Sequence, residues 1–91
     1  MTPLQDEFRR AVADLQPGEV VSYAEAARRA GNARWARSLG GFLSEHGDDL
    51  PWWRVVHRDG TLSAPDRADQ RRRLEAEGVD IEDDRVVGGV P

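Results

Sequence analysis

The residue types in this chain favour recognition over covalent chemistry. Cysteine is absent from the 91 residues, so they offer no thiol nucleophile, no disulfide and no thiolate metal site. The two histidines, His46 and His57, are too few for a metal cluster, and we expect no metal and no cofactor. No serine, histidine and aspartate follow an order typical of a hydrolase.

All 13 basic residues are arginines, and they are unevenly distributed. Four of them fall within ten residues that contain no acid: Arg28, Arg29, Arg34 and Arg37. Planar guanidinium groups suit bidentate phosphate contacts and stacking on bases. Because local field rather than the net charge of −4 steers a polyanion, this window predicts a nucleic-acid surface. Genome base composition is the alternative explanation for the arginine excess.

Apolar spacing and capping residues predict helices in the first half of the chain. Thr2-Pro3-Leu4-Gln5 starts a helix that ends at Pro17-Gly18. Ser22 with Glu25 forms a second capping box, for a short helix through Ala30 that Gly31 closes. Asn32 then caps a third helix from Ala33 to about Glu45. Two helices joined by Gly31-Asn32 are typical of a helix-turn-helix, whose second helix contacts DNA.

The third helix contains the adjacent glycines Gly40 and Gly41, each costing about 1 kcal/mol against alanine. Two compatible explanations exist: close packing between helices, or close approach of the helix backbone to another surface such as DNA.

The second half predicts a small β-hairpin and a last helix. Trp53 to His57 is expected as a strand, Asp59-Gly60 as the hairpin turn, and Thr61-Leu62-Ser63 as the returning strand. Asp66 caps a helix to Glu77, which Gly78 closes, and weak extended signals follow at Val79–Ile81 and Arg85–Val87. We therefore expect a mainly α fold with a small β-hairpin, as one domain over residues 1–91.

Six acidic residues and no basic one lie between Glu75 and Asp84, in or next to a tail that covers about residues 79–91. This acidic tail is either a solvated surface that weakens non-specific DNA binding or a docking surface for a partner protein. No apolar run approaches the roughly 20 residues that span a bilayer. We expect no membrane contact, and a cytoplasmic protein that joins the nucleoid when bound to DNA.

Several motifs follow one another in a fixed order. They are Gly18-Glu19-Val20-Val21-Ser22-Tyr23, then Gly31-Asn32, Ala36-Arg37 and Gly40-Gly41, then Leu50-Pro51-Trp52-Trp53-Arg54-Val55-Val56, and last Leu74-Glu75-Ala76-Glu77-Gly78. The ordered set resembles the C-terminal domain of the O6-alkylguanine-DNA alkyltransferases. Its active-site motif, Pro-Cys-His-Arg-Val-Val, is matched with Trp52 at the cysteine position and Trp53 at the histidine position. Tryptophan at the cysteine position is typical of the alkyltransferase-like proteins.

This resemblance implies a winged-helix-like, helix-turn-helix DNA-binding domain of the alkyltransferase C-terminal type. It implies a protein that is not an enzyme, because an indole at Trp52 cannot attack an alkyl carbon and Trp53 cannot relay a proton. Such a protein docks in the minor groove, flips O6-alkylguanine out of double-stranded DNA, and flags it for nucleotide excision repair. A damage-recognition ATPase is then an expected partner, and a monomer is the default state. The family's histidine-orienting glutamate aligns with Arg71.

The resemblance also assigns roles to individual residues. Tyr23 pushes the phosphate of the target nucleotide, and Arg37 is the arginine finger that enters the stack. The lesion pocket is expected from Trp52, Tyr23, Val55 and Arg67, with main-chain atoms contributing at Trp52 and Val55. DNA-backbone contacts are expected from Ser22, Arg34 and Trp35.

Structural alternatives remain for several of these residues. Tyr23 is otherwise a packing aromatic, Arg37 a solvated arginine and Trp52 a core-filling side chain. Core packing is the preferred explanation for Trp53, and His57 is expected at the surface. A second function is a winged-helix-like regulator without lesion specificity, with the Asp59-Gly60 hairpin as its wing. The exposed part of the third helix offers mostly serine and glycine, which favours recognition of damage over recognition of base edges.

Overall fold

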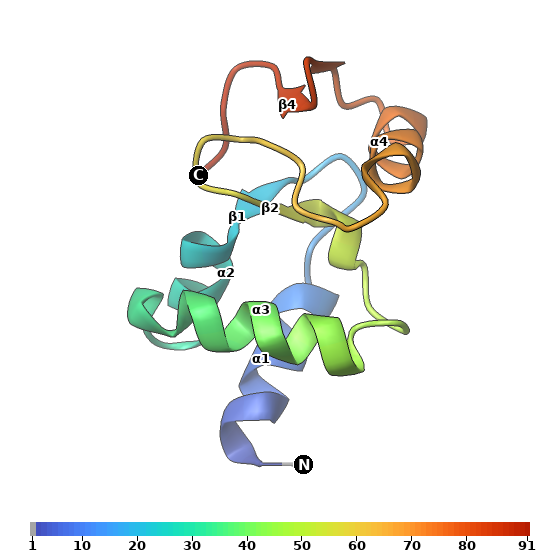
Figure 1. The fold of residues 1–91 in the computed structure, drawn as a ribbon. Coiled ribbons are helices and arrows are strands. Elements are labelled where there is room, and N and C mark those ends of the chain that lie inside the picture. The colour runs from blue at the N-terminus through green and yellow to red at the C-terminus, as the bar shows by residue number, and fades with distance from the viewer. Residues whose placement is uncertain (1) are drawn as a thin grey trace.

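The computed structural model describes residues 2–91, in which four α-helices surround a short pair of parallel strands (Figure 1). The helices are α1 (Pro3–Ala13), α2 (Tyr23–Ala30), α3 (Ala36–His46) and α4 (Arg67–Ala76). The strands are β1 (Val21–Ser22), β2 (Val55–Val56), β3 (Ile81–Glu82) and β4 (Arg85–Val86). Two 3-10 turns, η1 (Ala33–Trp35) and η2 (Trp52–Arg54), precede α3 and β2.

The expected helix starts are confirmed by their caps. Thr2 forms a complete capping box with Gln5, and the side chains of Ser22 and Asp66 accept from the third backbone N–H of α2 and α4. The third helix differs from its prediction because Asn32 caps the 3-10 turn η1, and α3 itself begins only at Ala36. The helix-turn-helix is therefore α2, the Gly31-Asn32 turn, η1 and α3.

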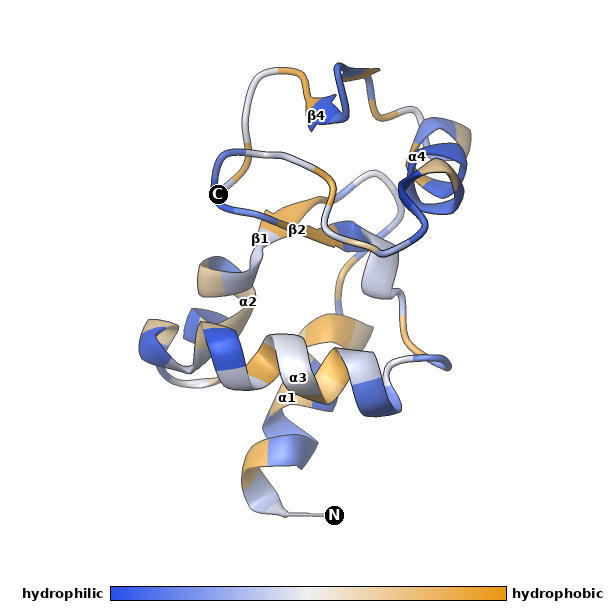
Figure 2. Cartoon of the chain, in the orientation of Figure 1, coloured by the Kyte–Doolittle hydropathy of each residue, from blue (hydrophilic) through white to orange (hydrophobic). Residues whose placement is uncertain are grey.

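The two faces of the β1–β2 pair carry separate apolar clusters. The strands run parallel with Val21 opposite Val55, and these two side chains pack with α1, α2 and α3. Val20 and Val56 belong to the second cluster, with Leu62, Leu74 and Val86, which joins α4 and the tail. Successive residues of a strand point to opposite faces, so one short strand pair holds both halves together. Figure 2 shows the apolar strand pair between the helices, whereas α4 is mostly hydrophilic.

The predicted hairpin from Trp53 to Ser63 is wrong, although a hairpin exists elsewhere. The chain does turn tightly at Asp59-Gly60, where His57 N–H donates to the Thr61 carbonyl over 3.0 Å, but β2 pairs with β1. The antiparallel hairpin is β3–β4, whose turn residues Asp83 and Asp84 have φ values of 51° and 57°. Left-handed geometry at both turn residues matches a type I′ turn. The fold class, mainly α with a small β-hairpin, is confirmed.

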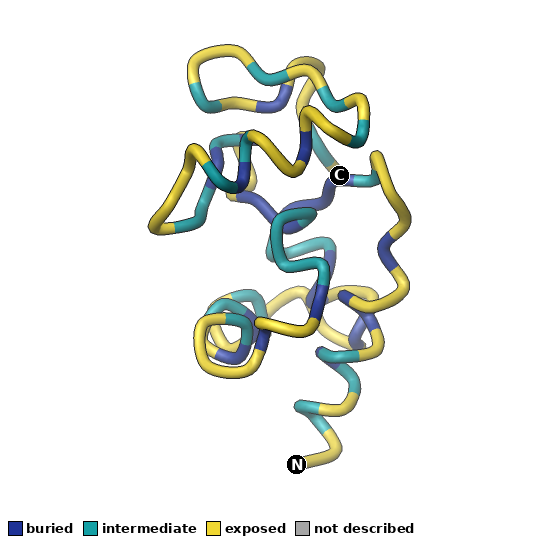
Figure 3. Tube along the Cα trace, turned by 90° about the vertical axis from the view of Figure 1, so that its right-hand side faces the viewer, coloured by how far each residue is buried: buried dark blue, intermediate teal, exposed yellow. Residues whose placement is uncertain are grey.

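The tail is part of the fold. Leu62 N–H donates to the Asp84 carbonyl over 2.8 Å, and Val86 is buried in the second cluster. Ser22 N–H donates to the Pro91 carbonyl, which brings the last described residue back to β1. Buried segments in Figure 3 lie mainly along the middle of the molecule, where the two clusters meet the strands. Within residues 2–91, no helix has the length and apolar character needed to cross a membrane.

Candidate functional site: a pocket beside the helix-turn-helix

A pocket of about 520 Å³ lies between the helix-turn-helix and the start of α4. Tyr23 from α2 and Trp52 from η2 both line it, with Gly40 from α3. The remaining lining residues come from α3 and its following loop, the segment before α4, and α4 itself: Leu43, Ser44, Asp48, Ser63, Ala64, Pro65, Asp66 and Asp69. The volume lies within the range of roughly 300–1,000 Å³ typical of small-molecule sites.

Tyr23 is held at the wall of this pocket by a chain of hydrogen bonds. Its hydroxyl donates to Ser63 Oγ over 2.9 Å, and Ser63 Oγ donates to the Val55 carbonyl over 3.0 Å. The ring also faces Gly40, where an added Cβ would lie 3.8 Å from it. Tyr23 is half-buried, so both expectations for it, packing and pocket wall, describe part of its position.

The two tryptophans meet edge to face, with ring centroids 5.8 Å apart and planes at 89°. Arg73 from α4 places its guanidinium 5.4 Å from the Trp52 ring centre and 4.9 Å from that of Trp53. Trp53 packs against the second apolar cluster, as preferred from the sequence, whereas Trp52 lines the pocket. A cation over the faces of both rings fixes the Trp52 indole from outside the pocket.

Glu77 anchors the same turn from the end of α4. Its carboxylate accepts from Trp53 Nε1 over 2.9 Å, from Arg54 Nη2 over 2.7 Å, and from Gly18 N–H over 2.8 Å. Arg54 also donates to the Leu15 carbonyl over 2.7 Å, which extends the network to the segment after α1. Hydrogen bonding to Arg54, more than any other contact, lowers the pKa of Glu77 to about 2.

This network corrects one alignment. Arg71 does not contact Trp53 but pairs with Asp84 of the tail. The carboxylate that faces the residue at the histidine position is that of Glu77, six residues later and at the C-cap of α4. The orienting glutamate implied by the resemblance is therefore present, although its partner is an indole.

Sequence reasoning missed Gln70, a fully buried polar residue of α4. Its Nε2 donates to the carbonyls of Trp53 and Val55 over 3.1 and 3.2 Å, and its Oε1 accepts from the N–H groups of Ser63 and Ala64. Four hydrogen bonds from one side chain fix the turn that carries Trp52 against the segment that forms the opposite pocket wall. The only sequence signal was a polar residue four positions before the buried Leu74 on the same helix face.

Arg37 lies on a shallow groove of about 400 Å³ next to the pocket, lined also by Ala36, Gly41 and His57. Tyr23 and Gly40 line both the groove and the pocket, so the two are contiguous. His57 is exposed, as expected, with its ring 6.0 Å from that of Tyr23. The predicted arginine finger thus lies on one continuous surface with two of the four predicted pocket residues, Tyr23 and Trp52.

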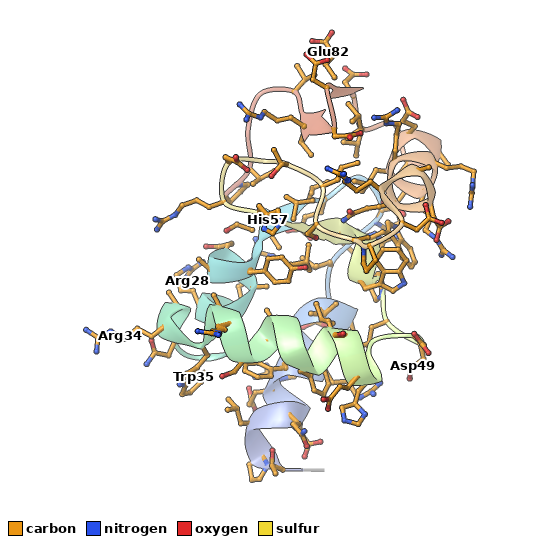
Figure 4. All side chains as sticks on the ribbon, viewed as in Figure 1. Arg28, Arg34, Trp35, Asp49, His57 and Glu82 are labelled. Atoms are coloured by element: carbon orange, nitrogen blue, oxygen red, sulfur yellow. The ribbon has the colours of Figure 1, made fainter. Side chains whose placement is uncertain are left out.

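Arginines without an ion pair lie in or beside the helix-turn-helix. In the part of the chain that the structure describes, three arginines form no ion pair: Arg34, Arg37 and Arg58. Arg28 and Arg29, counted in the basic window, are instead bound by Glu25, and Arg29 also by Glu19. Arg58, which the sequence did not single out, lines a small groove with Ser22, Arg28 and Ala33. In Figure 4, Arg28 and Arg34 extend from the same side of the molecule.

Four residues that were predicted to contact the base or the DNA backbone are engaged in other contacts or lie outside the pocket. Val55 is fully buried, does not line the pocket, and its carbonyl already accepts from Ser63 and Gln70. Arg67 is exposed at the start of α4, outside the pocket lining and 4.0 Å from Asp84. Ser22 is buried and uses its hydroxyl to cap α2. Trp35 packs edge-on against Phe8, with ring centroids 6.4 Å apart. Their contacts with a base or phosphate stay predictions.

Among residues 2–91, no group of histidine, aspartate and glutamate side chains is arranged to hold a metal ion. The polar groups around the pocket are hydroxyls, carboxylates and an indole, which suit binding and orientation of a ligand.

Comparisons with known proteins agree with this geometry. Residues 3–79 match the family described as "6-O-methylguanine DNA methyltransferase, DNA binding domain". The chain is 47% identical over 72 residues to the "DNA base-flipping protein" of Escherichia coli, covering 75% of this chain and 56% of that relative. It is 38% identical over 77 residues to "Alkyltransferase-like protein 1" of Schizosaccharomyces pombe, covering 78% of this chain and 71% of the relative. The chain thus spans little more than half the length of the bacterial relative.

A solved structure shares the fold. The crystal structure of S. pombe Atl1 in complex with damaged DNA containing O6-carboxymethylguanine superposes with a TM-score of 0.79 at 34% identity, over 90% of this chain and 82% of that one. A second, of the S. pombe protein in complex with DNA, has a TM-score of 0.78 at 28% identity, over 94% of this chain and 88% of that one. The chain therefore belongs to the family of the 6-O-methylguanine DNA methyltransferase DNA-binding domain, and its relatives within that family include alkyltransferase-like proteins.

Proposed function

We propose that this protein binds O6-alkylguanine in double-stranded DNA by flipping the damaged nucleotide, and does not remove the alkyl group. One observation carries the proposal: Tyr23 and Trp52 line a pocket that is contiguous with the groove of Arg37. Helix α3 docks in the minor groove, Arg37 takes the place of the extruded base, and the base enters the pocket against Trp52. Extrusion costs a few kcal/mol and less for a badly paired base, which biases it toward O6-alkylguanine.

The inability to remove the alkyl group follows from residues in and beside the same pocket. Trp52 and Trp53 stand where the resemblance places the nucleophilic cysteine and its histidine, and neither indole supplies a thiolate or a titrating imidazole. Glu77 keeps its place but holds Trp53 and Arg54, so no proton is relayed through it. The protein is thereby a sensor, and a bound lesion passes to other proteins. We propose nucleotide excision repair as that route, with a damage-recognition ATPase as partner of a cytoplasmic, monomeric protein.

An equilibrium titration tests this function with two matched duplexes, one containing a central O6-methylguanine and one containing guanine. We expect clearly tighter binding to the lesion, with the methyl group still on the DNA afterward. Arg37→Ala should remove most of the preference, because the orphaned partner base loses its hydrogen-bonding cation. Arg10→Ala is the matched control, since it removes an exposed arginine of α1 that is paired with Glu7.

Three outcomes would contradict the proposal. Equal affinity for both duplexes would leave a general or sequence-specific DNA-binding domain. Loss of the methyl group from the duplex would show that the protein has repair chemistry. Unaltered affinity of Arg37→Ala for the lesion duplex would show that α3 does not place Arg37 in the minor groove.

A further inference from the structure

Arg37 and His57 are the basic residues that line the groove beside the pocket, and the proposed function uses only Arg37. His57 directly follows β2, and its ring is exposed beside α2 (Figure 4). A tight turn fixes its backbone, because its N–H donates to the Thr61 carbonyl over 3.0 Å and its carbonyl accepts from Gly60 N–H over 2.9 Å. The turn therefore holds the imidazole in the groove.

The imidazole of His57 has no anionic partner among residues 2–91, where its nitrogens form neither a hydrogen bond nor an ion pair. The nearest acid along the chain, Asp59, is hydrogen-bonded within its own turn and lies 3.6 Å from Arg85, so its charge is already shared. The other charged groups around the imidazole are cationic: Arg37 of α3 on the same groove, and Arg58, the next residue of the chain. A space bordered by these cations suits an anion.

Tyr23 places this imidazole at the mouth of the pocket. The two rings face each other with centroids 6.0 Å apart, and the Tyr23 hydroxyl is bound to Ser63 at the pocket wall. Tyr23 lines both the pocket and the groove, whereas His57 lines only the groove. A nucleotide whose base lies in the pocket therefore leaves its phosphate at the junction of the two, on the side of His57. An unflipped nucleotide keeps its phosphate in line with the rest of the duplex backbone.

We propose that His57 binds the phosphate of the flipped nucleotide as an imidazolium, and takes up a proton from solvent when the nucleotide flips. The inference rests on the proposed function and adds a contact that is made only in the flipped state. Imidazole is the side chain whose charge changes between about pH 5 and 8, and an adjacent phosphate favours its cationic form. Binding to the lesion thus strengthens as the pH falls, whereas binding to intact DNA stays nearly constant.

Equilibrium titrations of the O6-methylguanine duplex and the guanine duplex at about pH 8 and about pH 6 test this contact. For the wild-type protein we expect lesion affinity to rise about fivefold over this range, as for a phosphate that favours imidazolium about tenfold over imidazole. The slope of log lesion affinity against log salt concentration should also be steeper at the lower pH, by up to about 0.9. Binding to the guanine duplex should show neither change.

Two variants and a control separate the contact from a structural role. His57→Gln keeps a polar side chain that cannot be charged, so lesion affinity should lose its pH dependence. His57→Arg is cationic throughout, so lesion affinity should stay at the higher value at both pH values. His46→Gln is the matched control and should keep the wild-type pH dependence. It removes the other histidine of the chain, which packs against Phe42 with ring centroids 5.6 Å apart and lines neither the pocket nor the groove.

Preferential lesion binding that is the same at both pH values, or whose pH dependence survives in His57→Gln, would overturn the inference and leave the proposed function intact. An equal rise for both duplexes, with the lesion still preferred, would overturn it as well, because the phosphate in contact would not be that of a flipped nucleotide. Equal affinity for the two duplexes at both pH values would overturn the proposed function and this inference together.

Discussion

The carboxylate of Glu77 joins three segments of the chain, and its ionisation is a measurable part of stability. Its pKa is lowered to about 2 from an ordinary 4.5, first because Arg54 donates to it. A carboxyl with a lower pKa in the folded than in the unfolded chain stabilises the fold above its unfolded pKa. That contribution is lost as the pH falls from about 4.5 to about 2. The ion pair is largely buried, with side-chain exposures of 11% for Arg54 and 13% for Glu77.

We expect Glu77→Gln to lower the free energy of unfolding by about 2–3 kcal/mol near neutral pH, because it leaves the largely buried Arg54 without its anion. The difference from wild type should shrink as the pH falls below about 4.5, where wild-type Glu77 is itself being protonated. Urea unfolding at neutral and acidic pH measures both. Glu75→Gln is the control, since Glu75 is exposed on α4. A constant deficit across this range would mean that the carboxylate's charge contributes nothing.

Helix α3 contains a glycine that no contact among residues 2–91 explains. Gly41 is exposed, and an added Cβ would meet no atom within 4 Å, unlike Gly40, which faces Tyr23. Of the two explanations for the glycine pair, packing between helices therefore accounts only for Gly40. Gly41 lines the groove of Arg37, where a bound DNA backbone would approach the helix.

Gly41→Ala should separate stability from binding. Alanine is favoured over glycine inside a helix, so we expect the free energy of unfolding to rise by about 1 kcal/mol. The new methyl group projects toward the docked DNA, so affinity for a guanine duplex and for a lesion duplex should both fall. Chemical denaturation and the two titrations give the three quantities. A more stable variant with undiminished affinity would mean that α3 does not approach DNA at this glycine.

Local patterns predicted the elements that carry their own signals. Capping residues such as Thr2 and Asp66 directly precede the helices that they start, so these helix starts could be read from the sequence. The motif that contains Trp52 pointed to a residue that lines the pocket. The pairing of β1 with β2 joins residues 34 positions apart through two-residue strands, which leave no periodic pattern. Gln70 was missed because its four partners come together only after folding.

The position of the orienting glutamate was assigned to Arg71 because a sequence alignment carries no information about contacts. Arg71 and Glu77 lie on or beside the same helix, and only the hydrogen bond to Trp53 distinguishes which of them takes the orienting position. The hairpin was misplaced for a related reason. Asp59-Gly60 is a strong turn signal by itself, whereas the Asp83-Asp84 turn depends on two aspartates adopting left-handed geometry.

At the scale of the whole molecule, opposite charges are separated along a body about 36 Å long and 21–22 Å across. Arg34 and Arg37 belong to the helix-turn-helix, and Arg58 lines a groove with Ser22 and Arg28. Glu82 of the acidic tail lies at the top of the molecule in Figure 4, away from Arg34. The screening length is about 8 Å at physiological ionic strength, so the tail does not cancel the field of the arginines there. If the tail acts as a repulsive surface rather than as a docking surface, its effect on non-specific DNA binding is expected to be larger at low salt, where the screening length is longer.

Arg58 and Arg37 line two different grooves, and we predict different phenotypes for their removal. Arg58→Ala removes a cation from the small groove that Arg58 lines with Ser22 and Arg28. This groove lies outside the lesion pocket. Each phosphate contact contributes about 0.9 to the slope of log affinity against log salt concentration, so the slope should become shallower by about one. Affinities for lesion and guanine duplexes should fall by the same factor, because a phosphate contact carries no information about the base.

Arg37→Ala should instead reduce the ratio between the lesion and guanine duplexes, because its proposed partner is the orphaned base. Titrations of both variants at several salt concentrations, with Arg10→Ala as the control for loss of a distant arginine, give slopes and ratios from one data set. If Arg58→Ala changes the ratio while the slope stays constant, Arg58 contacts the base or its pocket and the division between steering and recognition fails. An arginine without an ion pair must release counterions when a DNA phosphate reaches it. If both variants keep the wild-type salt slope and the wild-type ratio of affinities, DNA therefore approaches from another side of α3.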